Sequence, residues 1–441
     1  MAILIIPGEV RQECAPNFSF SHFGVSSGIK SIDPMNSQSS RSQSKSFLVQ
    51  SFLLGLLLIV NSCNTANKEN QQAEAAVADA GFVPNPQTIE EREVTTLEIG
   101  QQAPDFNLPG IDGKFHQLSD YDAGVLVILF TCNHCPTAQA YEERIINFVD
   151  DYQGKDVQLV AISPNNPLAV QLEELGYSDL NDSYEEMITR AAEKNFNFPY
   201  LYDGDTQEVA LKYGPVATPQ AFVFDPERTL RYVGRLDAIE KPGAGKAEDL
   251  RAAVEAVLAG ETPKVQETKT FGCSTKWGWK NKNHKAMDEN WAAREVSLTL
   301  VDEAGIRKVL DNTDSDKLRL VNLWATWCGP CIVEYPEFIK VHRMYKDRDF
   351  EFVSLSADKP EVEGKVLAFL KDRNSSVSNY LFSKEDKYAL IEAVDPEWNG
   401  ALPYTLLIAP GGEILWRHQG EVDFAELKKR IVDHPMIGRY Y

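Results

Sequence analysis

Residues 324–336 read Trp-Ala-Thr-Trp-Cys-Gly-Pro-Cys-Ile-Val-Glu-Tyr-Pro and contain a Cys-x-x-Cys motif, Cys328 to Cys331. The motif follows an apolar stretch that predicts a β-strand, and it opens a helical pattern. A second motif, Cys132-Asn133-His134-Cys135, stands in the same place between a strand and a helix. This context predicts redox motifs rather than incidental cysteines. We expect the first cysteine of each motif at a helix N-terminus, where unpaired N–H groups and the helix dipole favour the thiolate, the reactive form.

The same order of elements surrounds both motifs. Around the first we expect a hairpin that ends at Leu118, strands at 125–130 and 157–162, helices at 136–149, 183–194 and 207–213, a hairpin at 221–234 and a closing helix at 247–258. Around the second we expect strands at 318–324 and 350–356, helices at 332–345 and 361–372, a hairpin at 405–417 and a closing helix at 423–432. Strands that alternate with helices and end in a hairpin predict an α/β fold, with two three-layer α/β/α sandwich domains in tandem.

Length and composition agree with two domains and exclude one class of partner. At 441 residues the chain exceeds what one hydrophobic core usually serves. Lys and Arg number 44 against 65 Asp and Glu, a net charge of −21, and no basic run is present, so nucleic-acid binding is excluded. Four of the seven cysteines lie in the two motifs, which indicates catalytic use rather than a disulfide framework.

The N-terminal region has the shape of a signal peptide. Lys45 precedes an apolar run at 47–60, which is too short to span a bilayer comfortably, and Ser62-Cys63 follows. Because Ser62-Cys63 resembles a bacterial lipobox, we predict cleavage and lipidation at Cys63, and thus a membrane-anchored lipoprotein of the bacterial cell envelope or periplasm. Met35 is the expected start, which makes 1–34 an over-extended N-terminus and 35–63 the signal peptide. An ordinary transmembrane anchor and a plain secretion signal are the alternatives.

Composition divides the rest of the chain. Residues 64–93 are rich in Ala, Gln, Glu and Asn with little periodicity, which predicts a flexible linker. We expect a first domain at 94–280 and a second domain at 297–435, joined by a charged linker at 281–296 whose residues 281–294 fit a short helix.

Three segments carry a resemblance to known proteins. Residues 100–108, Gly-Gln-Gln-Ala-Pro-Asp-Phe-Asn-Leu, and 113–121, Gly-Lys-Phe-His-Gln-Leu-Ser-Asp-Tyr, resemble the opening of redoxins of the AhpC/TSA and TlpA types. Residues 324–336 resemble the active site of TlpA/ResA-type extracytoplasmic thiol-disulfide oxidoreductases, which belong to the thioredoxin-like superfamily. The resemblance covers most of residues 95–435. It implies a redoxin-like first domain, a TlpA/ResA-like second domain and thiol-disulfide exchange as the activity.

The resemblance assigns roles to residues of the second motif. Cys328 would attack a substrate disulfide, and Cys331, one turn deeper, would resolve the mixed disulfide. Cytosolic thioredoxins carry a buried Asp on the preceding strand, where this chain has Asn322, and Glu334 matches the acid of the TlpA/ResA group. Burial of Glu334 near two thiols would raise its pKa into a range useful for proton transfer. A solvent-facing Glu334 is the alternative.

One proline in each domain precedes an apolar strand, Pro219 in the first domain and Pro403 in the second. Thioredoxin-like proteins place a cis-proline there. It brings backbone beside the cysteine pair, where that backbone docks an extended substrate segment and keeps metal off the thiolates. The alternative is an ordinary proline at the start of a strand.

The first motif lacks an acid at the positions that carry one in relatives of the second. His134 is the ionisable group between its thiols, and a protonated His134 would stabilise a thiolate at Cys132 or Cys135. Capping of the helix or exposure to water is the alternative role for His134. Residues 272–277, Gly-Cys-Ser-Thr-Lys-Trp, complete a resemblance to redoxins with a Cys-Asn-His-Cys-Pro site. Cys273 would resolve or relay between the thiols, or be a buried, unpaired thiol.

Other functions stay open for the first domain. Thiol peroxidase activity is disfavoured, because the Pro-x-x-x-Thr-x-x-Cys site of peroxiredoxins is absent and Pro219 stands where they supply an Arg. Cys132, His134, Cys135 and Cys273 offer ligands for zinc or copper, although a cis-proline would obstruct the approach. A non-catalytic docking module, with the chemistry in the second domain alone, is the third alternative.

The sequence therefore predicts a thiol-disulfide oxidoreductase that uses redox-active disulfides and needs no cofactor or resident metal. The expected partners are protein thiols or disulfides of the envelope and a membrane thiol reductase as electron donor. The direction of electron flow depends on reduction potentials that no feature of the sequence sets.

Overall fold

The computed structural model of the protein describes residues 81–439. The predicted signal peptide, the lipidation site Cys63 and residues 64–80 of the predicted linker lie outside the described residues. Within residues 81–439, no helix combines the length and the apolar character needed to span a membrane.

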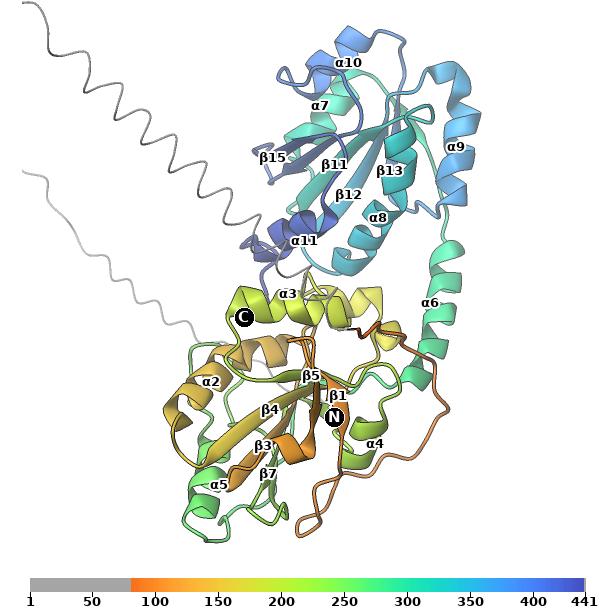
Figure 1. The fold of residues 1–441 in the computed structure, drawn as a ribbon. Coiled ribbons are helices and arrows are strands. Elements are labelled where there is room, and N and C mark those ends of the chain that lie inside the picture. The colour runs from red at the N-terminus through yellow and green to blue at the C-terminus, as the bar shows by residue number, and fades with distance from the viewer. Residues whose placement is uncertain (1–80, 440–441) are drawn as a thin grey trace, which may run out of the picture. The chain divides into compact units, whose positions relative to one another are not determined.

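A five-stranded sheet forms the centre of the first domain, in the order β5-β4-β3-β7-β8 (Figure 1). Its strands are β3 (Val125–Phe130), β4 (Val157–Ser163), β5 (Tyr200–Tyr202), β7 (Gln220–Phe224) and β8 (Leu230–Gly234). Strand β3 pairs parallel with β4 and antiparallel with β7. All 6 residues of β3 are buried, as expected for a central strand that is covered on both faces.

Helices cover both faces of this sheet. They are α2 (Pro136–Tyr152), α3 (Tyr184–Lys194), α4 (Glu208–Tyr213) and α5 (Glu248–Leu258). Val127 and Leu129 of β3 pack with side chains of α2, α3 and α5, whereas Ile128 and Phe130 pack with side chains of α4. Successive residues of a strand point to opposite faces, so β3 contributes to both halves of the core.

A six-stranded sheet forms the centre of the second domain, in the order β10-β13-β12-β11-β14-β15 (Figure 1). Its strands are β10 (Thr299–Val301), β11 (Leu318–Trp324), β12 (Phe350–Ser356), β13 (Ser378–Phe382), β14 (Tyr404–Ile408) and β15 (Ile414–Gln419). Strand β11 pairs parallel with β12 and antiparallel with β14, just as β3 does with β4 and β7. The strand that leads into each Cys-x-x-Cys motif is therefore central in its sheet.

The second sheet is also covered on both faces. Its helices are α7 (Glu303–Asp311), α8 (Gly329–Tyr345), α9 (Glu363–Asp372), α10 (Lys387–Val394) and α11 (Phe424–Asp433). Leu318 and Leu320 of β11 pack with α8, α9 and α11, whereas Val321 and Leu323 pack with α7 and α10. Both domains thus have three layers, helix, sheet and helix.

Short elements complete the described chain. They are the hairpin of β1 (Asn107–Pro109) and β2 (Phe115–Gln117), the two-residue pair of β6 (Ala217–Thr218) and β9 (Cys273–Ser274), helix α6 (Lys282–Ala292), and the 3-10 helices η1 (Leu118–Asp120), η2 (Pro167–Ala169), η3 (Leu172–Leu175), η4 (Gly278–Asn281) and η5 (Pro360–Val362).

The structure confirms the predicted fold class, with helices on both faces of each sheet. The peptide bonds Thr218–Pro219 and Leu402–Pro403 are cis, which confirms that prediction for both prolines. Helix α8 begins at Gly329 rather than at 332, and α6 occupies most of the segment expected as a linker. The exact boundaries of the domains and linkers stay predictions.

Candidate thiol sites

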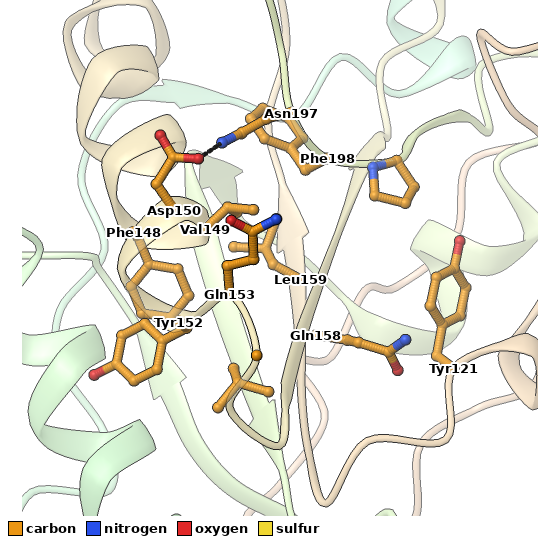
Figure 2. A pocket seen from close by; sticks show the side chains of 13 residues that line it. Tyr121, Phe148, Val149, Asp150, Tyr152, Gln153, Gln158, Leu159, Asn197 and Phe198 are labelled. Carbon is orange, nitrogen blue, oxygen red and sulfur yellow. Dashed lines mark hydrogen bonds between the residues drawn. The ribbon is translucent and has the colours of Figure 1, made fainter.

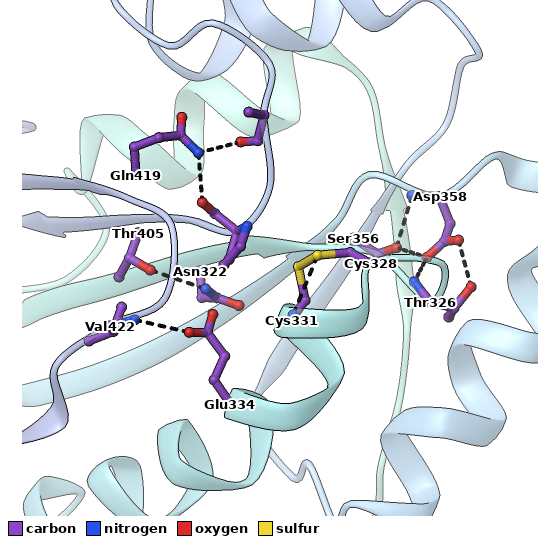
Figure 3. The surroundings of a disulfide bond; sticks show 12 residues. Asn322, Thr326, Cys328, Cys331, Glu334, Ser356, Asp358, Thr405, Gln419 and Val422 are labelled. Atoms are coloured by element: carbon purple, nitrogen blue, oxygen red, sulfur yellow. Dashed lines mark hydrogen bonds between the residues drawn. A yellow bond between two sulfur atoms is a disulfide. The ribbon is translucent and has the colours of Figure 1, made fainter.

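The second-domain motif lies where β11 meets α8. Cys328 is the N-cap of α8, and its sulfur lies 3.4 Å from the backbone N of Cys331. The two cysteines form a disulfide with an S–S length of 2.04 Å (Figure 3). This arrangement confirms the predicted place of Cys328 at a helix N-terminus, where the unpaired N–H groups of the first turn stabilise a thiolate.

A buried aspartate fixes the loop before Cys328. Asp358 follows β12, and its carboxylate accepts hydrogen bonds from the backbone N and the hydroxyl of Thr326, at 2.8 and 2.7 Å (Figure 3). Trp327, between Thr326 and Cys328, is 68% exposed. Sequence reasoning does not identify Asp358, because it comes from a loop 32 residues away and no local pattern links it to the motif.

Glu334 is buried, so the solvent-facing alternative is wrong. Its carboxylate accepts a hydrogen bond from the backbone N of Val422 at 3.1 Å, and its other oxygen is buried without a hydrogen-bond partner among the described residues. Burial raises the pKa of Glu334 to about 7, although the N–H of Val422 opposes the shift. Glu334 lies one helical turn after Cys331, and a carboxyl group that titrates near neutrality there is suited to accept and return a proton.

Hydrogen bonds fix the loop that contains the cis-proline. Gln419 donates to the carbonyl oxygens of Ala401 and Pro403, at 2.8 and 2.9 Å (Figure 3). Asn322 of β11 donates to the hydroxyl of Thr405 at 3.1 Å. A neutral amide therefore occupies the strand position at which an Asp would titrate, which leaves Glu334 as the buried acid on this side of the disulfide.

A pocket of about 310 Å³ opens next to Trp327. Its wall includes Trp398 and Leu402, which precede Pro403 in the chain, and Tyr388 and Ile391 of α10. Tyr388 is 66% exposed. Aromatic and aliphatic side chains thus line a depression that adjoins both the residue before Cys328 and the residue before the cis-proline.

The first-domain motif meets its helix in a different register. Helix α2 begins at Pro136, and its N-cap is Cys135. The prediction that Cys132 lies at the helix N-terminus is therefore wrong. A residue that precedes proline avoids the helical region, so Cys135 has extended backbone angles (φ −70°, ψ 120°) and the helix begins only after it.

Three thiols gather around Thr218, the residue before cis-Pro219. The sulfur of Cys132 lies 3.1 Å from the hydroxyl oxygen of Thr218, and the sulfur of Cys135 lies 3.3 Å from its carbonyl oxygen. The backbone N of Cys273 donates to the sulfur of Cys135 at 3.2 Å. All three cysteines are free thiols, and Cys273 is partly exposed, so the alternative of a buried, unpaired Cys273 is wrong.

A glycine brings Cys273 to this place. Thr218 of β6 pairs with Cys273 of β9. Gly272 has a φ of +129°, and a Cβ at this position would lie 2.1 Å from the carbonyl oxygen of Thr218. Any other residue would push β9 away from β6, so the contact between Cys273 and Cys135 depends on Gly272.

His134 is buried and ion-paired, so helix capping and exposure to water are both wrong for it. Its Nδ1 lies 2.6 Å from one oxygen of Asp182, and Asn165 donates to the same oxygen at 2.8 Å. The other oxygen accepts the backbone N–H groups of Asn133 and His134, at 2.8 and 3.0 Å. Burial disfavours both charges, but Asp182 raises the pKa of His134 and His134 lowers the pKa of Asp182.

Asp182 is a site residue that sequence reasoning missed. It lies 48 residues from His134 in the sequence and carries no signature of its own. The helix start at Tyr184 places it in a loop before α3, where acidic residues are common, so the sequence holds no signal that separates it from its neighbours.

The three thiols differ in acidity. Burial disfavours a thiolate at Cys135, but hydrogen bonds from Cys132 and Cys273 and the charge of His134 outweigh burial and hold the pKa of Cys135 well below its usual value. Burial, followed by the hydrogen bond to Cys135, raises the pKa of Cys132 well above its usual value. The hydrogen bond to Cys135, followed by burial, raises the pKa of Cys273. Cys135 is therefore the first of the three to ionise.

The 272–277 segment is anchored against the loop after β4. The backbone N of Lys276 donates to the side chain of Asn165 at 2.8 Å, and the backbone N of Asn166 donates to the carbonyl of Lys276 at 2.9 Å. The rings of Trp277 and Trp279 stack with their centroids 5.1 Å apart. Because Asn165 also binds Asp182, the His134–Asp182 pair and the segment that carries Cys273 share one support.

A metal site at the first motif would need ligand atoms that already have hydrogen-bond partners. Ligand atoms of Cys132, His134 and Asp182 lie within 4.8 Å of one another, a group that includes two of the four predicted ligands. Both oxygens of Asp182 already accept hydrogen bonds from the motif, and its contact with His134 Nδ1 is short at 2.6 Å. A metal ion would have to displace these bonds, so the donor set fits zinc or copper poorly and we derive no step through a metal.

A second pocket, larger than the one beside Trp327, lies away from the thiols of the first domain. It has a volume of about 360 Å³ and is lined by residues near the end of α2 and the start of β4, among them Phe148, Tyr152 and Gln158 (Figure 2). A hydrogen bond of 2.8 Å joins Asn197 to Asp150 at its edge. The 17 residues of α2 span ~25 Å and carry Cys135 at the opposite end, so this pocket is not part of the thiol site.

Comparisons with known proteins match both domains. The AhpC/TSA family model matches residues 99–233, and the Redoxin model matches residues 289–431. The thiol-disulfide oxidoreductase ResA of Halalkalibacterium halodurans is 28% identical over 133 residues, which cover 28% of this chain and 71% of ResA. The thiol:disulfide interchange protein HelX of Rhodobacter capsulatus is 27% identical over 150 residues, 33% of this chain and 78% of HelX.

A solved structure is also similar to part of the chain. An uncharacterized conserved protein from Geobacillus kaustophilus is 37% identical, with a TM-score of 0.36, and the match covers 41% of this chain and 92% of that one. From the two family matches, the shared sheet topology and the thiol-disulfide oxidoreductases among its relatives, we conclude that this chain is an oxidoreductase of thioredoxin type, with an AhpC/TSA-type domain and a Redoxin-type domain in tandem.

Proposed function

We propose that the protein exchanges dithiols and disulfides with protein substrates of the bacterial cell envelope, and that Cys328 and Cys331 form its principal reactive site. One observation carries the proposal. Cys328 caps α8, and Glu334, a buried carboxyl group with a pKa of about 7, lies one turn beyond Cys331. The names of the relatives ResA and HelX, a thiol-disulfide oxidoreductase and a thiol:disulfide interchange protein, support the same activity.

The exchange proceeds through a mixed disulfide. The thiolate of Cys328 attacks one sulfur of a substrate disulfide, a Cys328–substrate bond forms, and the other substrate sulfur leaves. Glu334 accepts the proton of Cys331 and returns it to the leaving sulfur. The Cys331 thiolate then attacks the sulfur of Cys328 and releases the substrate as a dithiol. Two electrons pass from the cysteine pair to the substrate, and the same steps in reverse oxidise a substrate dithiol.

The substrate segment docks where the cis-proline loop meets Trp327. An extended polypeptide would run along the backbone at Pro403, as the sequence analysis expects for this proline. The pocket of about 310 Å³ beside Trp327 would accept a large apolar side chain next to the substrate cysteine. This surface favours protein substrates over small thiols, because a small thiol would leave the pocket empty.

The first domain supplies a second thiol site. Cys132, Cys135 and Cys273 surround Thr218, and the buried His134–Asp182 pair lies beside them, where the carboxylate raises the pKa of His134. Electron pairs would pass between the two domains by the same kind of exchange. Thiol peroxidase activity stays less favoured, because the peroxiredoxin motif is absent from the sequence.

The location and the electron donor are further parts of the proposal. They rest on the sequence of residues 35–63, with lipidation at Cys63 anchoring the chain to a membrane. A membrane thiol reductase would then be the electron donor, because both proteins would be held at the same membrane.

A redox titration of the full chain tests this function. Thiol labelling and mass spectrometry across dithiothreitol redox buffers should show two reversible two-thiol transitions at separable potentials, with no metal bound to the same sample. The double variant C328A/C331A is the control, and it should lose one transition and keep the other. A first domain that resists oxidation and purifies with stoichiometric zinc or copper would contradict the second site and favour the metal alternative.

A further inference from the structure

The third thiol of the first domain lies outside the part of the chain that the AhpC/TSA model matches, which ends at residue 233. Cys273 is 138 residues from Cys135 in sequence, yet its backbone N donates to the sulfur of Cys135 at 3.2 Å. The structure therefore gives Cys135 two thiol neighbours, Cys132 within the motif and Cys273 from β9.

Exposure separates these two neighbours. Cys132 is 4% exposed and Cys135 is 0% exposed, whereas Cys273 is partly exposed. Of the three sulfurs of this site, that of Cys273 is therefore the most accessible to a protein substrate.

The environment of Cys135 suits the second sulfur of a disulfide with Cys273, the one that leaves as a thiolate. Cys135 caps α2, it accepts the N–H of Cys273, and it follows His134, whose ring contacts Asp182 at 2.6 Å. These groups stabilise a thiolate at the buried position, and a stable thiolate leaves readily from a disulfide. Cys132 does not lie at a helix terminus, and its sulfur contacts the hydroxyl of Thr218.

We propose that the working redox pair of the first domain is Cys135 and Cys273, with Cys273 as the sulfur that meets the protein substrate and Cys132 as a positioning thiol that hydrogen-bonds to Cys135. The proposal rests on the proposed function, in which this domain exchanges a dithiol with a protein substrate. It deepens that function by replacing the Cys-x-x-Cys pair with a pair that spans two segments of the chain.

The exchange balances as follows. One thiolate of a substrate dithiol attacks the sulfur of Cys273 in the Cys135–Cys273 disulfide, that disulfide breaks, and Cys135 leaves as a thiolate. The second substrate thiolate then attacks the substrate sulfur of the mixed disulfide, and Cys273 leaves and takes up a proton. The substrate loses two electrons and becomes a disulfide, and the Cys135–Cys273 pair gains them. A protein disulfide restores the pair by the reverse steps.

Trypsin makes the test sharp, because cleavage after Lys114 and Arg144 places Cys132 and Cys135 on one peptide, and cleavage after Lys269 and Lys276 places Cys273 on another. The full chain with C328A/C331A is equilibrated with oxidised dithiothreitol, alkylated and digested without reduction. We expect a crosslink between peptides 115–144 and 270–276. We also expect the crosslink to persist when C132A is added and to be lost when C135A or C273A is added.

The opposite result is equally definite. A peptide 115–144 that loses two hydrogens and carries no crosslink, in the parent and in C273A, would overturn the proposal and leave the proposed function standing with Cys132 and Cys135 as the pair. A site that forms neither disulfide at any buffer potential would overturn the proposal and the second thiol site of the proposed function, and would leave exchange at Cys328 and Cys331 standing. The parent chain alone distinguishes a crosslink from a disulfide within peptide 115–144, so a variant that fails to fold does not weaken that part of the test.

Discussion

The two Cys-x-x-Cys motifs follow equivalent central strands, yet different cysteines cap the helices that follow. Cys328 caps α8, whereas Cys135, the second cysteine of its motif, caps α2. The residue before proline explains the difference. Cys135 stands directly before Pro136, and its Cβ would clash with the proline ring in the helical region, so its backbone stays extended. The residue before Pro330 is Gly329, which has no Cβ and is the first residue of α8. The spacing of two cysteines therefore does not determine which sulfur receives the helix N-terminus.

The charges beside the thiols differ as well. The first site has a buried pair, His134 with Asp182, and the second has a carboxyl group, Glu334, that forms no ion pair within residues 81–439. A cation stabilises the thiolate and so makes a disulfide more oxidising, whereas a carboxyl group with a pKa of about 7 moves a proton. The two sites therefore present different kinds of ionisable group to their thiols.

The largest expected effect is on the rate of disulfide reduction, when the attacking sulfur of the second site, Cys328, is removed. C328S, in a chain whose first site is silenced by C135A/C273A, should reduce insulin disulfides at least ~10³-fold more slowly, because serine is a poor nucleophile for sulfur. C331S should instead accumulate a mixed disulfide between Cys328 and insulin, visible on a non-reducing gel. Equal residual activity in C328S and the parent would show that Cys328 is not the attacking sulfur.

The next effect concerns the two buried aspartates that hold the motif loops. Asp182→Ala removes the partner of a buried cation, so we expect domain stability to fall by ~3–5 kcal/mol. Asp358→Ala removes hydrogen bonds without leaving a buried cation, so we expect ~1–3 kcal/mol. Urea unfolding of the reduced chain, followed by hydrogen exchange of the β3 and β11 peptides, measures each domain separately. Equal losses in the two domains would mean that His134 is not charged in the folded state.

The sequence predicts the scaffold of this comparison well. Runs such as 125–130 and 318–324 are continuous and apolar, as buried parallel strands require, and both form central strands. Glu334 is predictable for a similar local reason, since it lies one turn from Cys331 on the same helix. Its burial and both cis-prolines agree with the predictions.

The sequence does not reveal contacts between residues that lie far apart in the chain. Asp182 and Asp358 come from loops 48 and 32 residues from the groups they bind, and nothing in their neighbourhoods marks them. Cys273 is recognisable as a candidate, but its position against Cys135 depends on the pairing of β6 with β9 across most of the domain. The start of α2 after Cys135 is predictable from the sequence, because Pro136 follows Cys135 and disfavours a helical backbone there.

A pH profile tests the role of Glu334. Because the pKa of Glu334 is about 7, resolution of the mixed disulfide should quicken ~10-fold from pH 6 to pH 8 as the carboxylate forms. E334Q should be slow and lack this rise, whereas Glu337→Gln, a change on the exposed side of α8, should keep it. Stopped-flow measurement of the Cys328–substrate intermediate gives the rate. A rise that survives in E334Q would assign the proton transfer to another group.

The same pKa makes a prediction for stability. A carboxyl group whose pKa is raised on folding binds its proton more tightly in the folded state than in the unfolded state. The second domain should therefore be most stable below pH 4.5 with respect to this group, and lose that contribution as the pH rises through about 7. Chemical denaturation of E334Q across this range should lack that slope.

The smallest effect compares the two glycines nearest the thiols. Gly272→Ala places a Cβ 2.1 Å from the carbonyl of Thr218 at a φ of +129°, so β9 must shift and carry Cys273 away from Cys135. Gly329→Ala is the matched control, because its Cβ meets nothing within 4 Å. We expect G272A to form the crosslink between peptides 115–144 and 270–276 several-fold more slowly, and G329A to leave the Cys328–Cys331 titration unchanged. An unaltered crosslinking rate in G272A would mean that the approach of Cys273 to Cys135 does not depend on the β6–β9 pairing, and would remove the geometric basis for treating them as one pair.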